Sequence, residues 1–177
     1  MILKNKKLLV ITSLLTLLPI PVGLLLWDKF PETMAVHFGL TGQADGFASI
    51  PTAVFLPPLL MLATHLFCIL VCSLDPGNKN RNEKILHIVL WTVPVICNLS
   101  SCSIYALALG VEFSPVLWTM VPMGLLFALI GNFLPKTRMN STMGIKVPWA
   151  YSSEENWNAT HRFAGKVWVI GGILMAL

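Results

Sequence analysis

Four long apolar runs without Asp, Glu, Lys or Arg constrain this chain more than any other feature. They cover residues 8–27, 50–74, 85–110 and 116–134. A helix needs about 20 apolar residues to cross the hydrocarbon core of a bilayer. Only 11% of the 177 residues are charged, whereas soluble domains carry about 25%. The runs therefore predict a membrane protein whose helices cross the bilayer.

A fifth apolar run, residues 167–177, ends the chain. Counted from Phe163 it has 15 residues, which is about 22 Å of helix, and the hydrocarbon core is about 30 Å thick. We therefore expect a fifth span that is cut short, with a sixth helix following in a longer chain. The predicted fold class is all-α, a multi-pass transmembrane helical bundle with about five spans.

Basic residues alternate between the connections, and this pattern predicts the orientation. The N-terminus, the 75–84 connection and the 135–166 segment hold eleven of the twelve Lys and Arg residues. The other two connections hold Lys29 together with four acidic residues. Because cytoplasmic loops carry the excess of Lys and Arg, the N-terminus is predicted to be cytoplasmic. The same pattern makes the 28–49 loop extracellular and the 135–161 segment cytoplasmic.

Three regions follow from these runs. Residues 1–74 form an N-terminal two-helix region that contains the extracellular loop 28–49. Residues 75–134 hold two further transmembrane helices. Residues 131–177 form a C-terminal region in which the cytoplasmic segment 135–161 leads into the short fifth span.

The extracellular loop is predicted to be compact and rich in turns, because glycines at 39, 42 and 46 adopt positive φ at little cost. Its apolar side chains are expected to pack on the membrane rim or on the helix ends; they are Val36, Phe38, Leu40 and Phe47. His37 and Asp45 are the groups that could bind something. Three interpretations of this pair remain open. The two side chains could form a hydrogen bond that stabilises the loop, recognise a partner, or bind a metal, although a metal site usually needs more than two ligands.

The cytoplasmic segment contains a helix start. Ser152 and Glu155 fit the spacing of a capping box, so a helix should begin near residue 153 and continue into the fifth span. One face of this helix carries Trp157, His161, Ala164 and Trp168. We expect this face to pack on the turn at Pro148 and Trp149 and on the inner ends of the third and fourth spans. His161 is then either a structural histidine or a group that handles protons or a ligand.

Two motif groups resemble the SdpI family of bacterial membrane proteins. His37-Phe38 followed by Gly42-x-x-Asp45-Gly46 is similar to the small N-terminal domain of that family. The second group, within residues 131–166, contains Gly-Ile-Lys-x-Pro-Trp at 144–149, Ser-x-Glu-x-x-Trp and Thr-His-Arg. It resembles the family's C-terminal signature. Family members usually have six spans, so this chain departs from them by stopping within the fifth.

The resemblance implies an immunity and signalling protein of the bacterial plasma membrane. Such a protein protects the cell from a secreted antimicrobial peptide and recruits a soluble transcriptional repressor to the membrane. The candidate residues for the toxic peptide, on the extracellular side, are His37, Gly42, Asp45 and Gly46. The cytoplasmic signature comprises Asn132, Asn140, Gly144, Lys146, Pro148, Trp149, Glu154, Trp157, His161 and Arg162. No cofactor is expected. Direct binding of nucleic acid is not expected either, because no block of Lys and Arg is long enough to follow a phosphate backbone.

The residues within the spans also bear on two other function classes, a transporter and an enzyme. A small transporter or channel could use a polar path between proline-kinked helices, with His65 in mid-span and a polar third span. No span contains a carboxylate or Arg of the kind that proton relays use. An enzyme is not expected, because HExxH, GxSxG and paired carboxylates within a span are missing. Glu154 and His161 lie about 10 Å apart along a helix, too far to share a metal.

Overall fold

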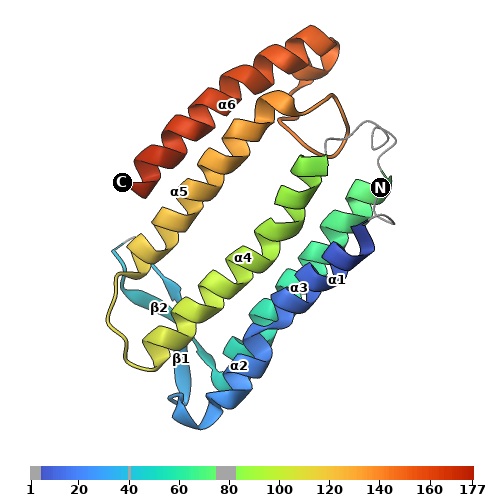
Figure 1. The fold of residues 1–177 in the computed structure, drawn as a ribbon. Helices are drawn as coiled ribbons and strands as arrows, with labels where there is room; N and C mark the ends of the chain where they lie inside the picture. The colour runs from blue at the N-terminus through green and yellow to red at the C-terminus, as the bar shows by residue number, and fades with distance from the viewer. Residues whose placement is uncertain (1–4, 40, 75–82) are drawn as a thin grey trace. The chain divides into compact units, whose positions relative to one another are not determined.

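The computed structural model describes residues 5–39, 41–74 and 83–177. Its main elements are the helices α1 (Lys6–Leu17), α2 (Pro19–Leu25), α3 (Ile50–Leu74), α4 (Glu83–Ala108), α5 (Pro115–Phe133) and α6 (Glu154–Ala176) (Figure 1). Two strands, β1 (Thr33–Phe38) and β2 (Ala44–Ser49), pair between α2 and α3. Short 3-10 helices are η2 (Trp27–Lys29), η4 (Leu134–Lys136) and η5 (Pro148–Ser152). The predicted all-α, multi-pass bundle is confirmed, and the two-stranded sheet is its one departure among the described residues.

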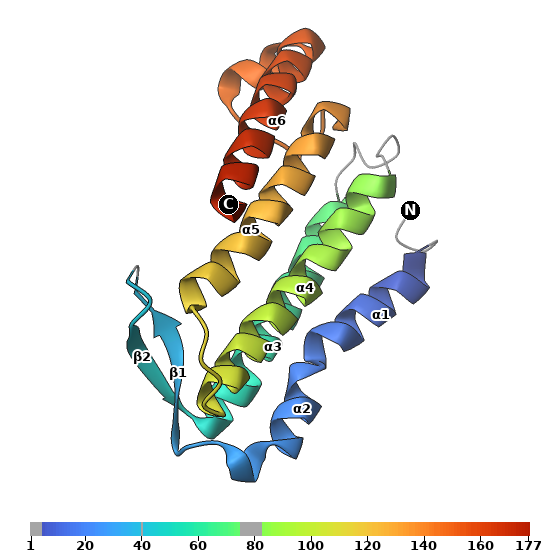
Figure 2. The same ribbon diagram turned by 60° about the vertical axis from the view of Figure 1, so that its left-hand side comes forward.

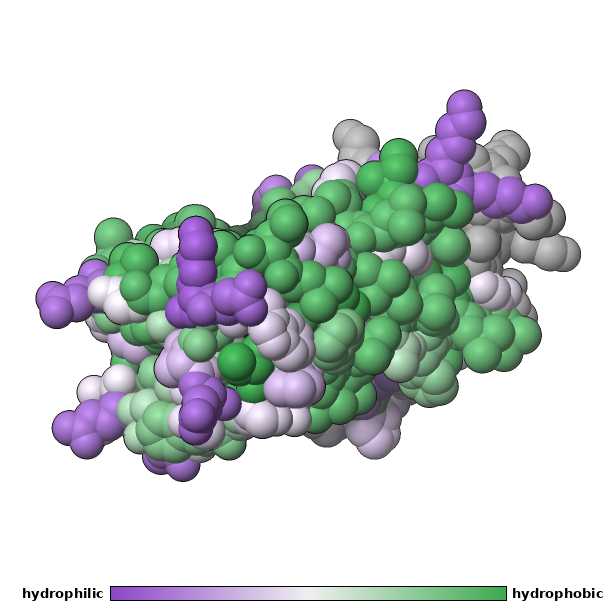
Figure 3. All heavy atoms as spheres, turned by 90° about the horizontal axis from the view of Figure 1, so that it is seen from below, coloured by the Kyte–Doolittle hydropathy of each residue, from purple (hydrophilic) through white to green (hydrophobic). Residues whose placement is uncertain are grey.

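Four segments are long and apolar enough to cross a membrane within the described ranges. They are residues 6–25, 50–74, 86–108 and 115–136, and they coincide with the four predicted runs. The fifth predicted run forms the second half of α6. This helix is not among the four, and its first half carries Glu154, Glu155, Arg162 and Lys166. Large apolar side chains are exposed along all these helices, and they predominate on the face drawn in Figure 3.

The chain divides into two compact units. The N-terminal unit contains residues 6–67 and 90–119, and the C-terminal unit contains residues 120–177 with the described parts of 68–89. In the N-terminal unit, α1, the first part of α3 and most of α4 lie side by side, and the β-hairpin joins α2 to α3 (Figures 1 and 2). In the C-terminal unit, α5 and α6 run antiparallel.

Pro19 splits the first predicted run into α1 and α2. Proline lacks the backbone N–H that would bond to the carbonyl of residue 15. In α4, the Asn98 side-chain amide donates to the Leu15 carbonyl at 2.8 Å, and the Tyr105 hydroxyl donates to the Pro19 carbonyl at 3.1 Å. The polar residues of the third span therefore satisfy carbonyls at a break in the first, as expected of polar side chains that join membrane helices.

Glycine and alanine bring α5 and α6 into backbone contact. A Cβ on Gly124 would lie 2.5 Å from the carbonyl oxygen of Gly172, and a Cβ on Gly165 would lie 2.8 Å from that of Gly131. No Cβ tolerates such distances, so each position needs glycine. Small residues allow membrane helices to approach this closely. The second half of α6 therefore lies along α5, itself a candidate span, as the predicted fifth span requires.

Candidate functional site

The 28–49 loop, which is predicted to be extracellular, forms a β-hairpin that the prediction of a compact, turn-rich loop did not anticipate. The strands pair antiparallel, with Thr33 opposite Ser49 and His37 opposite Gly46. Gly42 adopts φ 80° in the connection and donates its N–H to the Gly39 carbonyl at 2.9 Å. Backbone pairing thus determines the shape of this loop, and Gly42 supplies the positive φ of its turn.

His37 and Asp45 form an exposed pair on this hairpin. The His37 Nδ1 lies 2.5 Å from Asp45 Oδ1, and the two side chains are 73% and 54% exposed. A Cβ on Gly46 would lie 2.8 Å from the His37 Cβ, so glycine leaves room for the histidine. The four predicted extracellular residues therefore lie in one hairpin. No group of three metal-ligating side chains occurs among the described residues.

The base of the hairpin is buried in the N-terminal unit. Met34 is fully buried, and Phe30 packs on Tyr105 of α4 with ring centroids 5.2 Å apart. Val36 packs against the same cluster, as predicted for the apolar loop residues, whereas Leu40 lies outside the described residues. Phe47 is 64% exposed and is not part of this buried cluster. The hairpin is thus anchored at its base, and it exposes Phe47 two residues beyond Asp45.

Helix α6 begins at Glu154, close to the predicted start, but its cap differs from the prediction. Ser153, not Ser152, is the N-cap, and its Oγ accepts the Asn156 N–H at 3.1 Å. The Ser152 hydroxyl instead donates to the Trp149 carbonyl at 2.6 Å. Since Ser153 has the extended backbone of an N-cap, the true cap lies one residue after the proposed box.

Trp157 and His161 form the centre of the segment that is predicted to be cytoplasmic. Both are buried, and their rings stack with centroids 4.1 Å apart. The Trp157 indole N–H donates to the Thr137 carbonyl at 2.7 Å. His161 Nε2 lies 2.9 Å from the Ile145 backbone N–H, and its Nδ1 lies 2.8 Å from the Trp157 carbonyl. These partners require the neutral Nδ1–H tautomer, so His161 joins the loop to the helix.

Asn140 and Gly144 shape the loop that covers these rings. The Asn140 Oδ1 accepts the backbone N–H groups of Thr142 and Met143 at 2.9 and 2.6 Å, which is an Asx-type turn. Gly144 adopts φ 107°, and a Cβ there would overlap His161 Nε2. Met143 is buried with Cys72, next to Val89 and Phe133. The loop is therefore folded against the helix ends in this unit that carry Cys72, Val89 and Phe133.

The remaining signature residues lie on the surface. The turn at Pro148 and Trp149 contacts α6 as expected, but Trp149 itself is 64% exposed and is not the residue that packs on the buried face. The neighbouring Tyr151 takes that place, with its ring 5.4 Å from that of Trp157. Besides the loop-shaping Gly144, the exposed members of the signature are Asn132, Lys146, Pro148, Trp149, Glu154 and Arg162. The ten predicted residues thus separate into a buried or loop-shaping set and an exposed set.

His65 lies within the N-terminal unit. It is 1% exposed, and its Nε2 lies 3.1 Å from the hydroxyl of Thr12, which also donates to the Leu8 carbonyl at 2.9 Å. Asn98 and Tyr105 likewise donate to backbone carbonyls. These bonds join helices, and they give no specific support to the transporter alternative.

Comparison with known proteins agrees with the motifs. Residues 136–177 match the SdpI/YfhL protein family, and residues 14–62 match a domain of unknown function, DUF1648. The chain is 23% identical over 169 residues to the Immunity protein SdpI of Bacillus subtilis (strain 168), covering 95% of this chain and 79% of the relative. No solved structure matches the chain significantly. This chain is a multi-pass bacterial membrane protein, and its predicted resemblance to the SdpI family is confirmed.

Proposed function

We propose that this protein protects the cell from a secreted antimicrobial peptide, which its extracellular hairpin binds. The similarity to an immunity protein extends over 95% of the chain and includes the hairpin. The observation that carries the proposal is the exposed His37–Asp45 pair on a hairpin whose base is buried. The proposal assigns no catalytic role to any residue.

The hairpin has the chemical features that peptide recognition uses. Its base is held by Met34 and Phe30, so little conformational entropy is lost when a ligand binds. Its surface combines the polar pair His37 and Asp45 with the exposed ring of Phe47. Exposed aromatic residues near polar groups are typical of binding hot spots. A cationic or amphipathic peptide would contact the carboxylate and the ring together.

Replacing His37 or Asp45 with Ala should lower protection by about tenfold or more, because truncating a hot-spot residue costs about 1.4 kcal/mol of binding or more. The measurement is the toxic-peptide concentration that halves growth of a sensitive cell expressing each variant at equal membrane level. Gln43→Ala is the matched control, since Gln43 is an exposed polar residue in the same hairpin turn. Equal protection by all variants would contradict the role of the pair.

We further propose that Lys146, Pro148 and Trp149 of the exposed cytoplasmic signature bind a soluble transcriptional repressor when the peptide is bound. Trp149 supports this, because a 64% exposed tryptophan next to Pro148 and close to Lys146 has no packing role inside the segment. Tryptophan is among the commonest hot-spot residues of interfaces. The buried set, by contrast, holds the surface in shape.

Trp149→Ala should weaken peptide-dependent binding of the repressor about 30-fold, the cost of removing a hot spot of about 2 kcal/mol. Co-sedimentation of membranes with small DNA-binding regulators encoded beside the gene measures this. Asn158→Ala on the exposed side of α6 serves as the control. If Trp149→Ala membranes retain the regulator as wild-type membranes do, the docking surface is elsewhere.

A further inference from the structure

A groove in the C-terminal unit combines cations with an apolar wall. It has a volume of about 590 Å³ and lies between the end of α5 and the middle of α6. Its lining residues are Gly131, Asn132, Pro135, Arg162, Phe163, Gly165, Lys166, Val169 and Ile170. Gly131 and Gly165 are in backbone contact, and no side chain from either fills the space above them.

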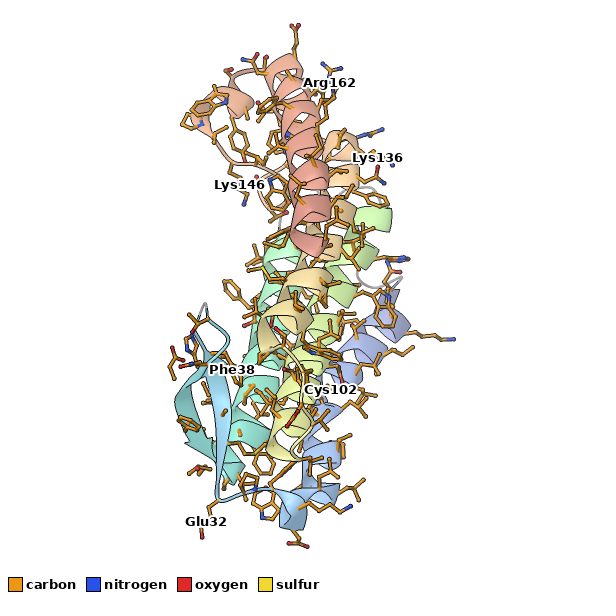
Figure 4. The ribbon with its side chains drawn as sticks, turned by 90° about the vertical axis from the view of Figure 1, so that its left-hand side faces the viewer. Glu32, Phe38, Cys102, Lys136, Lys146 and Arg162 are labelled. Carbon is orange, nitrogen blue, oxygen red and sulfur yellow. The ribbon has the colours of Figure 1, made fainter. Side chains whose placement is uncertain are left out.

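The charged groups of this groove are both positive. Arg162 and Lys166 are one helical turn apart on α6, and the lining contains no carboxylate. Within the described part of the chain, neither makes an ion pair. Figure 4 shows Arg162 extending from α6 on the side opposite Lys146. Two unpaired cations beside the amide of Asn132 form a site for an anionic group.

The lining of the groove changes from basic to apolar along α6. Val169 and Ile170 follow Lys166 by three and four residues along α6, which places them about 5 Å farther along the helix axis. Phe163 and Ile170 are 72% and 60% exposed. The candidate span of α5 ends at Lys136, so the cations lie at the end of the span and the apolar residues lie toward its middle. This order matches a phospholipid, whose phosphate lies outside its acyl chains.

We propose that this groove binds an anionic phospholipid of the inner leaflet, with its phosphate on Arg162 and Lys166 and an acyl chain along Val169 and Ile170. The predicted cytoplasmic orientation of this end places it among anionic headgroups, which attract basic side chains. The lipid would cover the α5–α6 contact next to the folded cytoplasmic cap. The proposal does not depend on the toxic peptide or on the repressor.

The test is binding of phosphatidylglycerol to the delipidated full-length protein in detergent, measured by native mass spectrometry. Arg162→Gln combined with Lys166→Gln should weaken binding about 30-fold, because each cation near an anionic lipid contributes a factor of about five. Phosphatidylcholine should bind weakly to both proteins. The charge-conserving pair Arg162→Lys and Lys166→Arg should bind phosphatidylglycerol nearly as the wild type does.

The matched control removes the same two charges elsewhere in this unit, by Arg138→Gln with Lys146→Gln. Both residues are exposed and do not line the groove. Binding should fall less than threefold in this control. Equal losses in both double variants, or no loss in either, would overturn the proposal. A dimer that excludes lipid would also overturn it, because a second copy would then occupy the groove.

Discussion

Gly172→Leu is expected to separate α6 from α5 and to lower stability by about 3 kcal/mol or more. A Cβ at this position would overlap the Gly124 carbonyl and lie 2.5 Å from the backbone nitrogen of Ala128. Backbone atoms cannot move aside as a flexible side chain can, so the helices must part along their length. Overpacking of a well-packed interior already costs about 1–3 kcal/mol where side chains can adjust. The measurement is thermal unfolding of the purified protein in detergent.

Gly171→Leu is the matched control, because it makes the same change at the adjacent residue of the same helix. A Cβ on Gly171 would meet nothing within 4 Å, so the new side chain would extend away from α5. This variant should unfold within a few degrees of the wild type or slightly above it, since leucine favours helix over glycine. Equal destabilisation of both variants would mean that α5 and α6 do not pack through Gly172.

His161→Phe is expected to open the loop that covers Trp157 and His161 while the body of the membrane protein stays folded. Phenylalanine can keep the stacking on Trp157, but it leaves the Ile145 N–H without its acceptor, a loss of about 2 kcal/mol. The population of open loop should rise about 30-fold. Trypsin cleavage after Arg138 and Lys146 in inside-out vesicles measures this, because proteolysis follows the open population when opening is fast.

His87→Phe provides the comparison, because His87 is an exposed histidine near the start of α4. Cleavage of this variant should match the wild type. Unchanged cleavage in His161→Phe would mean that the loop does not depend on the histidine acceptor. The result also affects how loss of function is interpreted. A variant of the buried set can lose function through unfolding of the loop, whereas Trp149→Ala tests the surface itself.

The apolar runs and the charge asymmetry were sufficient to predict the bundle. An uncharged run of about 20 residues in a bilayer has few stable structures other than a spanning helix. Local spacing predicted the buried face of α6 at Trp157 and His161, and it predicted the start of α6 to within one residue although the capping residue is Ser153 and not Ser152. The hairpin was not predicted from the sequence, because its strands are short, bulged and rich in small residues. A strand of six residues that is held by backbone pairing has little effect on local amino-acid composition, so composition does not predict it.

Only the tertiary structure separates the candidate residues into a buried set and an exposed set. Trp149 and Trp157 are the same residue type in one segment, yet one is exposed and the other is buried against Thr137 and Tyr151. Likewise Gly171 and Gly172 are indistinguishable in the printed sequence, and only one meets another backbone.

The sequence by itself therefore determined the membrane spans, their predicted orientation and the two segments that resemble the SdpI family. These properties depend on hydropathy, charge and short motifs, all of which are local along the chain. Only the tertiary structure shows which atom accepts the Ile145 N–H, which side chain contacts His37 and which residues line the α5–α6 groove. Those depend on contacts between residues distant in sequence, whose geometry results from packing of the chain.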